Sequence, residues 1–417
     1  MGNLLLTQLR SQMLYEGYES AWAIKRQSNL SNFFLETLAK SFIPPHLSWA
    51  QRYVTAKAEQ FRLMEFSHSR PKYQLKTFFD EKGLPKEYSE EMVYSTPFCN
   101  LLRFYKPDKR DLTKILLVAP MSGHFATLLT PTIQTLINHY DVYVTDWLNI
   151  REIPESKGLF NFNSFIEHIV EFMEYLEPPV HLLAVCQPTV ACLAASAYLE
   201  ETKSPNSPAS LILMAGPIDT RINPTKVNHL AAEKSIDWFA ENVISVVPDK
   251  YLGKNRRVYP GFMQLLSFMQ MNIGKHRESF QRLMAYRLEN EHAKAKMIVD
   301  FYKEYFAVMD LSADFFLETV QKIFQEHQLP YEQLEFRGQK VNLRAIRKSF
   351  LLTVEGEKDD ICGMGQTLAA HDLCSKLPQY KKNHYLQAGA GHYGVFSGSR
   401  WERGVYPVID NFIRQVN

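Results

Sequence analysis

Three residues of this chain have the types and the order needed for nucleophilic acyl transfer: Cys186, Asp359 and His392. Such a site needs a nucleophile, a base within hydrogen-bond reach and an acid that orients the base. Nucleophile, acid and histidine follow one another in this order in hydrolases built on an α/β sheet. The order therefore predicts a Cys-Asp-His triad.

Cys186 lies in the segment Ala184-Val-Cys-Gln-Pro188, after an apolar strand pattern at 180–185 and before a helix of small residues at 188–200. A tight strand-to-helix turn of this kind presents one side chain above the end of a sheet. Most such elbows contain Ser in Gly-x-Ser-x-Gly, and the chain contains no such motif. The alternative is a buried structural thiol, since free Cys is among the most buried residue types.

The acid and the base are each expected in a loop that follows a strand pattern. Asp359 follows the apolar run at 349–355, and Asp360 is the alternative acid. His392 lies in Ala388-Gly-Ala-Gly-His392, where the glycines allow the backbone to approach closely. Taken singly, the acid could cap a helix and the histidine could be solvated. Their order after the cysteine favours the catalytic interpretation.

Two backbone N–H groups are expected to form an oxyanion hole. One belongs to Gln187, directly after the nucleophile, and the other comes from the loop after an early strand. In that loop the candidates are Met121 and Ser122, because Pro120 has no N–H to donate.

The elements around these residues predict an α/β-hydrolase fold. Strand and helix patterns alternate over 111–217 and resume over 349–417, which indicates a mostly parallel sheet with helices on both faces. Residues 218–348 are expected to form a helical cap or lid, and residues 1–110 a mostly helical N-terminal extension.

Composition excludes several other classes. The chain has 417 residues and a formal net charge of +2, which gives no sign of nucleic-acid binding. No apolar run approaches the ~20 residues of a transmembrane segment. Five cysteines without a CxxC pair argue against a disulfide framework and against a zinc site, and favour a cytoplasmic protein with reduced thiols. The sequence predicts no cofactor and no metal.

Several ordered blocks of the sequence resemble the intracellular polyhydroxyalkanoate depolymerases, bacterial enzymes that mobilise stored poly(3-hydroxybutyrate) granules. The resemblance covers nearly the whole chain and is loose over the first 90 residues. The blocks are Val118 to Leu129, Asp141-Val-Tyr-Val-Thr-Asp-Trp147, Val185-Cys-Gln-Pro188, Gly216-Pro-Ile-Asp-Thr-Arg-Ile-Asn-Pro-Thr225, Gly356-Glu-Lys-Asp-Asp-Ile361 and Gly391-His-Tyr-Gly-Val-Phe-Ser-Gly398.

This resemblance implies the α/β-hydrolase fold and a triad carried onto Cys186, Asp359 and His392. It also implies hydrolysis of the polymer's ester bonds through a thioester, with 3-hydroxybutyrate monomers or oligomers as products, at the surface of cytoplasmic storage granules. Polyhydroxyalkanoate synthases resemble the pattern more distantly, and their elbow is usually Gly-x-Cys-x-Gly. Pro188 in place of the second glycine argues against a synthase.

Three alternatives stay open. Coenzyme A instead of water could accept the acyl group, or the chain could perform a synthase-like transfer. The chain could also be a non-catalytic granule-binding protein, with aromatic residues of the helical insertion facing polymer. The sequence leaves a homo-oligomer open as well.

Overall fold

The computed structural model of the chain describes residues 15–20, 37, 48–63, 66–79, 83–108, 112–271 and 273–416. The remainder of the predicted N-terminal extension lies outside these residues. Within them, no helix is both long and apolar enough to cross a membrane.

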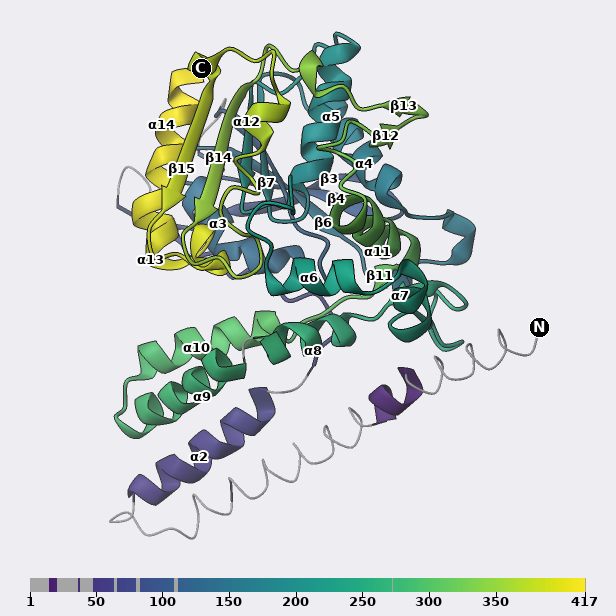
Figure 1. Cartoon of the computed structure of the whole chain (residues 1–417). Helices are drawn as coiled ribbons and strands as arrows, with labels where there is room; N and C mark the ends of the chain where they lie inside the picture. Colours follow the sequence, from purple (N-terminus) through teal and green to yellow (C-terminus); the bar gives the residue numbers. More distant parts are fainter. Residues whose placement is uncertain are drawn as a thin grey trace, which may run out of the picture.

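An eight-stranded sheet forms the centre of the fold (Figure 1). Its inner strands are apolar runs that are buried on both faces, as in parallel sheets covered by helices. Only β4 runs antiparallel to its neighbours, β3 and β6. In spatial order the strands are β15 (Lys382–Gln387), β14 (Phe350–Gly356), β8 (Ser210–Met214), β7 (Val180–Val185), β5 (Lys114–Val118), β6 (Asp141–Trp147), β4 (Cys99–Tyr105) and β3 (Ser89–Ser95).

Helices cover both faces of this sheet (Figure 1). The C-terminal helix packs on β14 and β8, and α5 packs on β7 and β8 beside α4. The helices on the two faces are α3 (Thr130–Leu136), α4 (Phe162–Tyr175), α5 (Thr189–Glu201), α12 (Ala370–Leu373), α13 (Gly398–Arg400) and α14 (Tyr406–Val416).

This strand order, with one antiparallel strand in second position along the chain, is the α/β-hydrolase fold. Counted along the chain, β5 is the third strand of the sheet, β7 the fifth, β14 the seventh and β15 the eighth. In this fold the loops after these four strands carry the oxyanion donors, the nucleophile, the acid and the histidine. The predicted fold class is confirmed.

Most of the insertion between β8 and β14 forms a cap below the sheet in the view of Figure 1, whereas its last hairpin lies beside α5. The insertion contains a three-stranded sheet and a two-stranded hairpin besides its helices, so the prediction of a helical cap is only partly correct. Strands of two or three residues are too short to leave a readable periodicity. The elements are α6 (Lys226–Glu233), α7 (Ile236–Asn242), β9 (Ser245–Val246), β10 (Arg257–Tyr259), α8 (Gly261–Met271), α9 (Ile273–Leu288), α10 (His292–Tyr305), β11 (Leu311–Ser312), α11 (Ala313–Thr319), β12 (Glu335–Phe336) and β13 (Gln339–Lys340).

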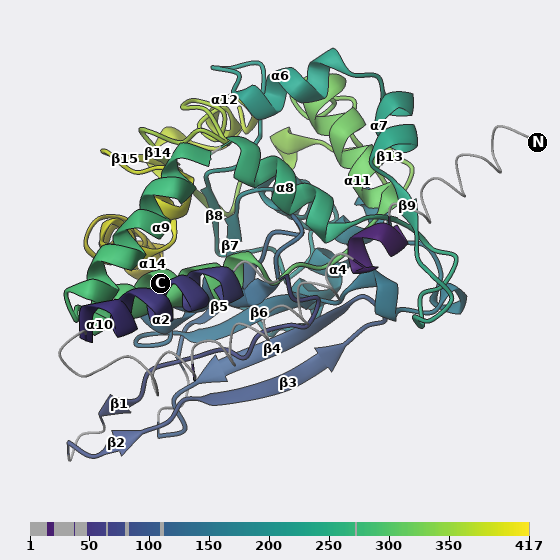
Figure 2. The same cartoon turned by 90° about the horizontal axis from the view of Figure 1, so that it is seen from below.

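The N-terminal part differs from its prediction in the same way. The short strands β1 (Phe78–Phe79) and β2 (Pro85–Lys86) pair with each other, and β3 and β4 complete the edge of the main sheet (Figure 2). Burial along β4 largely alternates, the pattern of a strand with one covered face. The segment expected to be mostly helical therefore contributes two strands to the main sheet.

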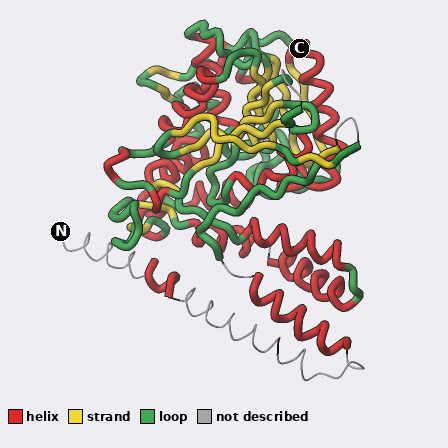
Figure 3. Tube along the Cα trace, turned by 180° about the vertical axis from the view of Figure 1, so that it is seen from behind, coloured by secondary structure: helices red, strands yellow, loops and turns green. Residues whose placement is uncertain are grey.

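One helix of the N-terminal part, α2 (Ser48–Leu63), packs against the cap rather than against the sheet. It lies beside α9 and α10 in an arm that projects from the core (Figures 1 and 3). Arg287 on α9 forms two hydrogen bonds of 2.6 Å with the carboxylate of Glu59 on α2. Leu63 joins the buried cluster between these helices. The N-terminal part and the cap are therefore packed together.

Candidate active site

Cys186 occupies a strained turn directly after β7. Its φ is +67°, a value that non-glycine residues rarely adopt and that tends to mark functional sites. Its N–H donates to the carbonyl of Met214 at 2.8 Å, and its own carbonyl accepts from the hydroxyl of Thr189 at 2.9 Å. These bonds hold the turn, and the thiol is only partly buried. The geometry is that of a nucleophile elbow.

Two residues around the elbow explain its departure from the usual glycine frame. Pro188 has φ −63° and ψ −14°, helical values that its ring favours, at the start of α5. The glycine needed for close packing is Gly216 instead, which lets the start of α5 lie against the loop after β8. A Cβ on Gly216 would lie 1.8 Å from the Thr189 hydroxyl oxygen. A proline therefore fits where other elbows have glycine.

Asp359 is oriented by both of its carboxylate oxygens. Oδ1 accepts hydrogen bonds of 2.9 Å from the N–H groups of Ile361 and Cys362, and Oδ2 lies 2.8 Å from Nδ1 of His392. The carboxylate is 1% exposed and the imidazole 6% exposed. The alternative acid, Asp360, is 44% exposed and forms an ion pair of 3.0 Å with Lys275. Of the two acids, the structure pairs Asp359 with the histidine.

The electrostatics of His392 connect it with Cys186. Burial alone would lower the pKa of His392, but the negative charges of Asp359 and of a Cys186 thiolate, with hydrogen bonds to both, raise it well above its usual value. A raised pKa favours the imidazolium, which stabilises a neighbouring thiolate. The structure thus brings together all three residues of the predicted triad.

Glu355, at the end of β14, is a buried acid that the sequence analysis did not single out. Its carboxylate accepts three hydrogen bonds of 2.8 to 3.0 Å, from the N–H groups of Gly365, Thr367 and Leu368. It thereby joins the strand to the segment that follows the Asp359 turn. The sequence signal that could have identified Glu355 is an acidic residue next to the last residue of an otherwise apolar strand.

The predicted oxyanion donors lie in two neighbouring loops. The N–H of Met121 donates to the side-chain oxygen of Gln187 at 3.4 Å, a long bond that joins the two loops. The backbone N–H groups of Ser122 and Gln187 have no acceptor among the described residues. The loop itself is fixed at Ala119, whose carbonyl accepts from the indole of Trp147 at 2.9 Å.

Comparison with known families gives a match in the C-terminal part of the chain. Residues 215–417 match the family described as PHB de-polymerase C-terminus. This part of the chain is therefore similar to the PHB depolymerases. It contains Asp359 and His392, whereas Cys186 precedes it. The family and the fold together support a hydrolase that acts on ester bonds.

Other comparisons add the following. The search of curated proteins found no match. Among solved structures, an esterase from Thermogutta terrifontis is 15% identical, with 79% of this chain and 99% of that chain covered and a TM-score of 0.42. The hydrolase BphD from Rhodococcus sp. strain RHA1 is 14% identical, with 79% and 99% covered and a TM-score of 0.44. A monoglyceride lipase from Saccharomyces cerevisiae is 11% identical, with 83% and 99% covered and a TM-score of 0.47.

A cavity of about 210 Å³ lies beside His392. Its walls combine the triad loop with aromatic side chains of the cap. Tyr393 packs against Phe301 and Tyr305, with ring centroids 5.9 and 6.4 Å apart. Burial and the neighbouring charge of Lys275 lower the pKa of His276 in the same wall. The lining is therefore largely aromatic, and it also includes the ion pair between Lys275 and Asp360. The other lining residues are Lys275, Ser279, Tyr302, Asp360, Ile361, Gly391 and Gly394.

Proposed function

We propose that the chain hydrolyses ester bonds of poly(3-hydroxybutyrate) and related polyhydroxyalkanoates through a thioester on Cys186. The observation that carries the proposal is the arrangement of Cys186, Asp359 and His392 on the loops after β7, β14 and β15. The match of residues 215–417 to the family described as PHB de-polymerase C-terminus supports the choice of polymer.

In the proposed reaction His392 accepts the thiol proton, and the thiolate of Cys186 attacks an ester carbonyl of the polymer. The carbonyl oxygen becomes an oxyanion, which the N–H of Gln187 and that of Met121 or Ser122 stabilise by roughly 3 kcal/mol per donor. Asp359 fixes the imidazole tautomer and stabilises the imidazolium. The N–H of Met121 already donates to the side-chain oxygen of Gln187, so this bond must break before Met121 can donate to the oxyanion.

The tetrahedral intermediate then expels the alcohol end of the polymer, and His392 returns the proton to it. The acyl group remains on Cys186 as a thioester. Water, deprotonated by His392, attacks this thioester and releases a 3-hydroxybutyrate monomer or oligomer with a free carboxylate. The thiol is regenerated with no net change of redox state.

The polymer fits the cavity in chemistry as well. Each repeat unit is uncharged and carries one methyl group, so it can pack against the rings of Phe301 and Tyr393 while its carbonyl faces the triad. Cytoplasmic location and association with storage granules are part of the same proposal.

Cys186→Ala tests the proposal on amorphous poly(3-hydroxybutyrate) granules, with Cys374→Ala, a buried cysteine of another loop, as the matched control. The expected result is loss of 3-hydroxybutyrate release in the first variant only. Release should not depend on coenzyme A, because water is the proposed acceptor. A Cys186→Ala enzyme with normal release would refute the mechanism, and strict dependence on coenzyme A would replace hydrolysis by thiolysis.

A further inference from the structure

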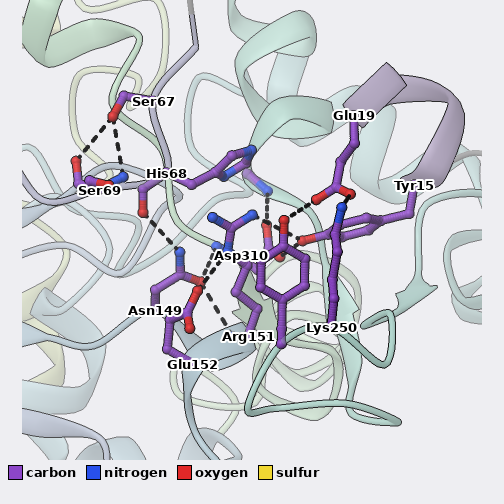
Figure 4. Close-up of polar contacts among 12 residues, drawn as sticks. Tyr15, Glu19, Ser67, His68, Ser69, Asn149, Arg151, Glu152, Lys250 and Asp310 are labelled. Atoms are coloured by element: carbon purple, nitrogen blue, oxygen red, sulfur yellow. Dashed lines mark hydrogen bonds and ion pairs between the residues drawn. The ribbon is translucent and has the colours of Figure 1, made fainter. Parts of the chain in front are cut away.

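A buried carboxylate outside the triad, Asp310, connects distant parts of the chain. Asp310 is 0% exposed. Oδ2 accepts a hydrogen bond of 2.5 Å from the hydroxyl of Tyr15, and Oδ1 accepts one of 3.0 Å from the N–H of Gly261 at the start of α8. Figure 4 shows Tyr15 reaching Asp310 from the N-terminal segment, here residues 15–20. One carboxylate thus holds both the N-terminal segment and the cap.

The partners of Asp310 are themselves fixed. Tyr15 is 0% exposed and packs edge-on against Phe262 at 6.1 Å. The backbone N–H of Asp310 donates to Oδ1 of Asn149 at 3.1 Å, and Nδ2 of Asn149 donates to the carbonyl of His68 at 3.3 Å (Figure 4). Because these donors and acceptors are satisfied and buried, the cluster is a rigid point in the fold.

The residues that precede Asp310 hold the oxyanion loop. Met309 donates its N–H to the carbonyl of Gly123 at 2.8 Å, and Val308 forms an antiparallel bridge with His124. Gly123 and His124 directly follow the two predicted donors of this loop.

Helix α8 contacts the same loop from its other side. Gly123 has φ +90°, and a Cβ on it would lie 2.7 Å from the side-chain oxygen of Gln264 on α8. The first N–H of α8 is the one that donates to Asp310. Segment 308–310 and α8 therefore enclose Gly123, and the Asp310 carboxylate joins them.

We propose that the Tyr15–Asp310 hydrogen bond positions the oxyanion loop, so that Tyr15 contributes to catalysis indirectly. Asp310 and Tyr15 touch no reacting atom and act as positioning residues through Met309 and α8. This role rests on the proposed function, because it concerns the donors that stabilise the oxyanion of ester hydrolysis.

The test is Tyr15→Phe in the full chain, which keeps the ring and removes only the hydroxyl. Tyr18→Phe is the matched control, because its hydroxyl, in the same segment, lies 3.3 Å from Nε2 of His68 and does not contact Asp310. With a short 3-hydroxybutyrate oligomer as substrate, kcat of Tyr15→Phe should fall by about 10- to 100-fold, the usual cost of a displacement near 1 Å. KM should stay within about threefold, and Tyr18→Phe should retain kcat within about twofold.

Two further readouts separate positioning from general damage. Butanal adds to the Cys186 thiolate to give a thiohemiacetal whose oxygen occupies the oxyanion position, so its inhibition constant should rise in proportion to the loss of kcat/KM. Alkylation of Cys186 by iodoacetamide does not use the oxyanion donors, so its rate should stay within about twofold. All assays are made well below the unfolding temperature of each variant.

If Tyr15→Phe does not fold, Asp310→Asn makes the same test, since it leaves one acceptor oxygen for two donors; the same loss of kcat and of butanal affinity is expected. Unchanged kcat and butanal affinity in Tyr15→Phe, with Cys186 still required, would overturn the positioning role alone. Activity that survives Cys186→Ala would instead remove the proposed function beneath it.

Discussion

Asp359 directs one carboxylate oxygen at Nδ1 of His392, 2.8 Å away, while its other oxygen accepts two backbone hydrogen bonds of 2.9 Å. The imidazole is therefore held from one side, and its Nε2 is left for Cys186. The neighbouring carboxylate of Asp360 turns to Lys275 instead.

This difference makes the two acids separable by mutation. Asp359→Asn should lower kcat on a 3-hydroxybutyrate oligomer by about 10³- to 10⁴-fold, the scale seen when the orienting acid of a triad becomes an amide. Asp360→Asn should stay within about threefold, since it removes only an exposed ion pair of small energy. Steady-state kinetics of both variants give the answer, and a larger loss in Asp360→Asn would reverse the assignment.

The raised pKa of His392 predicts a pH-dependent contribution to stability. A histidine whose pKa in the folded protein exceeds its unfolded value of about 6.5 stabilises the fold fully below that pH, and the contribution is lost as pH rises through the folded pKa. The gap in unfolding temperature between the wild type and His392→Gln should therefore be largest below about pH 6.5 and shrink as the pH rises through the folded pKa.

His229→Gln, which alters an exposed histidine of α6, controls for the loss of an imidazole. Calorimetric scans across the pH range measure the gap for both variants. A gap that stays constant, or that widens as the pH rises, would contradict the raised pKa of His392.

The aromatic wall of the cavity should determine the preference for longer substrates. Phe301→Ala removes a ring that packs on Tyr393, and it should lower kcat/KM for a 3-hydroxybutyrate trimer by about tenfold, the effect of roughly 1.4 kcal/mol. Hydrolysis of p-nitrophenyl acetate, which lacks the repeat units that would pack against the ring, should change by less than about threefold. Tyr380→Ala, 75% exposed, is the control, and equal losses on both substrates in Phe301→Ala would refute the assignment.

Granule association should depend on the arm. Trp49 and Tyr53 of α2 are 59% and 44% exposed and lie four residues apart, so they share one face of the helix. The double variant Trp49→Ala/Tyr53→Ala should sediment less with amorphous granules than the wild type, while it hydrolyses soluble oligomers at an unchanged rate. Unaltered co-sedimentation would exclude this face as the contact with polymer.

Much of the core could be predicted from the sequence because its signals are local. Apolar runs such as those of β5, β7 and β14 are interrupted by helix patterns, and this alternation alone indicates a parallel sheet. The triad residues were found from their loops and their order along the chain. The choice between Asp359 and Asp360 could not be made, since adjacent residues in a turn differ only in direction.

The contacts of the N-terminal part could not be predicted for a different reason. Tyr15 and Asp310 are 295 residues apart, and nothing in either local pattern announces their hydrogen bond. Strands β3 and β4 were missed because they contain many polar residues and lack the continuous apolar runs of the central strands. The long bond from Met121 to the Gln187 side chain likewise depends on two loops meeting in space.

The central claim is that Cys186 carries the acyl group during turnover. The most direct measurement is rapid acid quenching of the wild-type chain with a 3-hydroxybutyrate oligomer, followed by mass spectrometry of the peptide that contains Cys186. The expected result is a hydroxylamine-sensitive 3-hydroxybutyryl adduct on this cysteine that disappears when the substrate is consumed. Full turnover with no adduct on Cys186 at any time, together with normal activity of Cys186→Ala, would contradict the account.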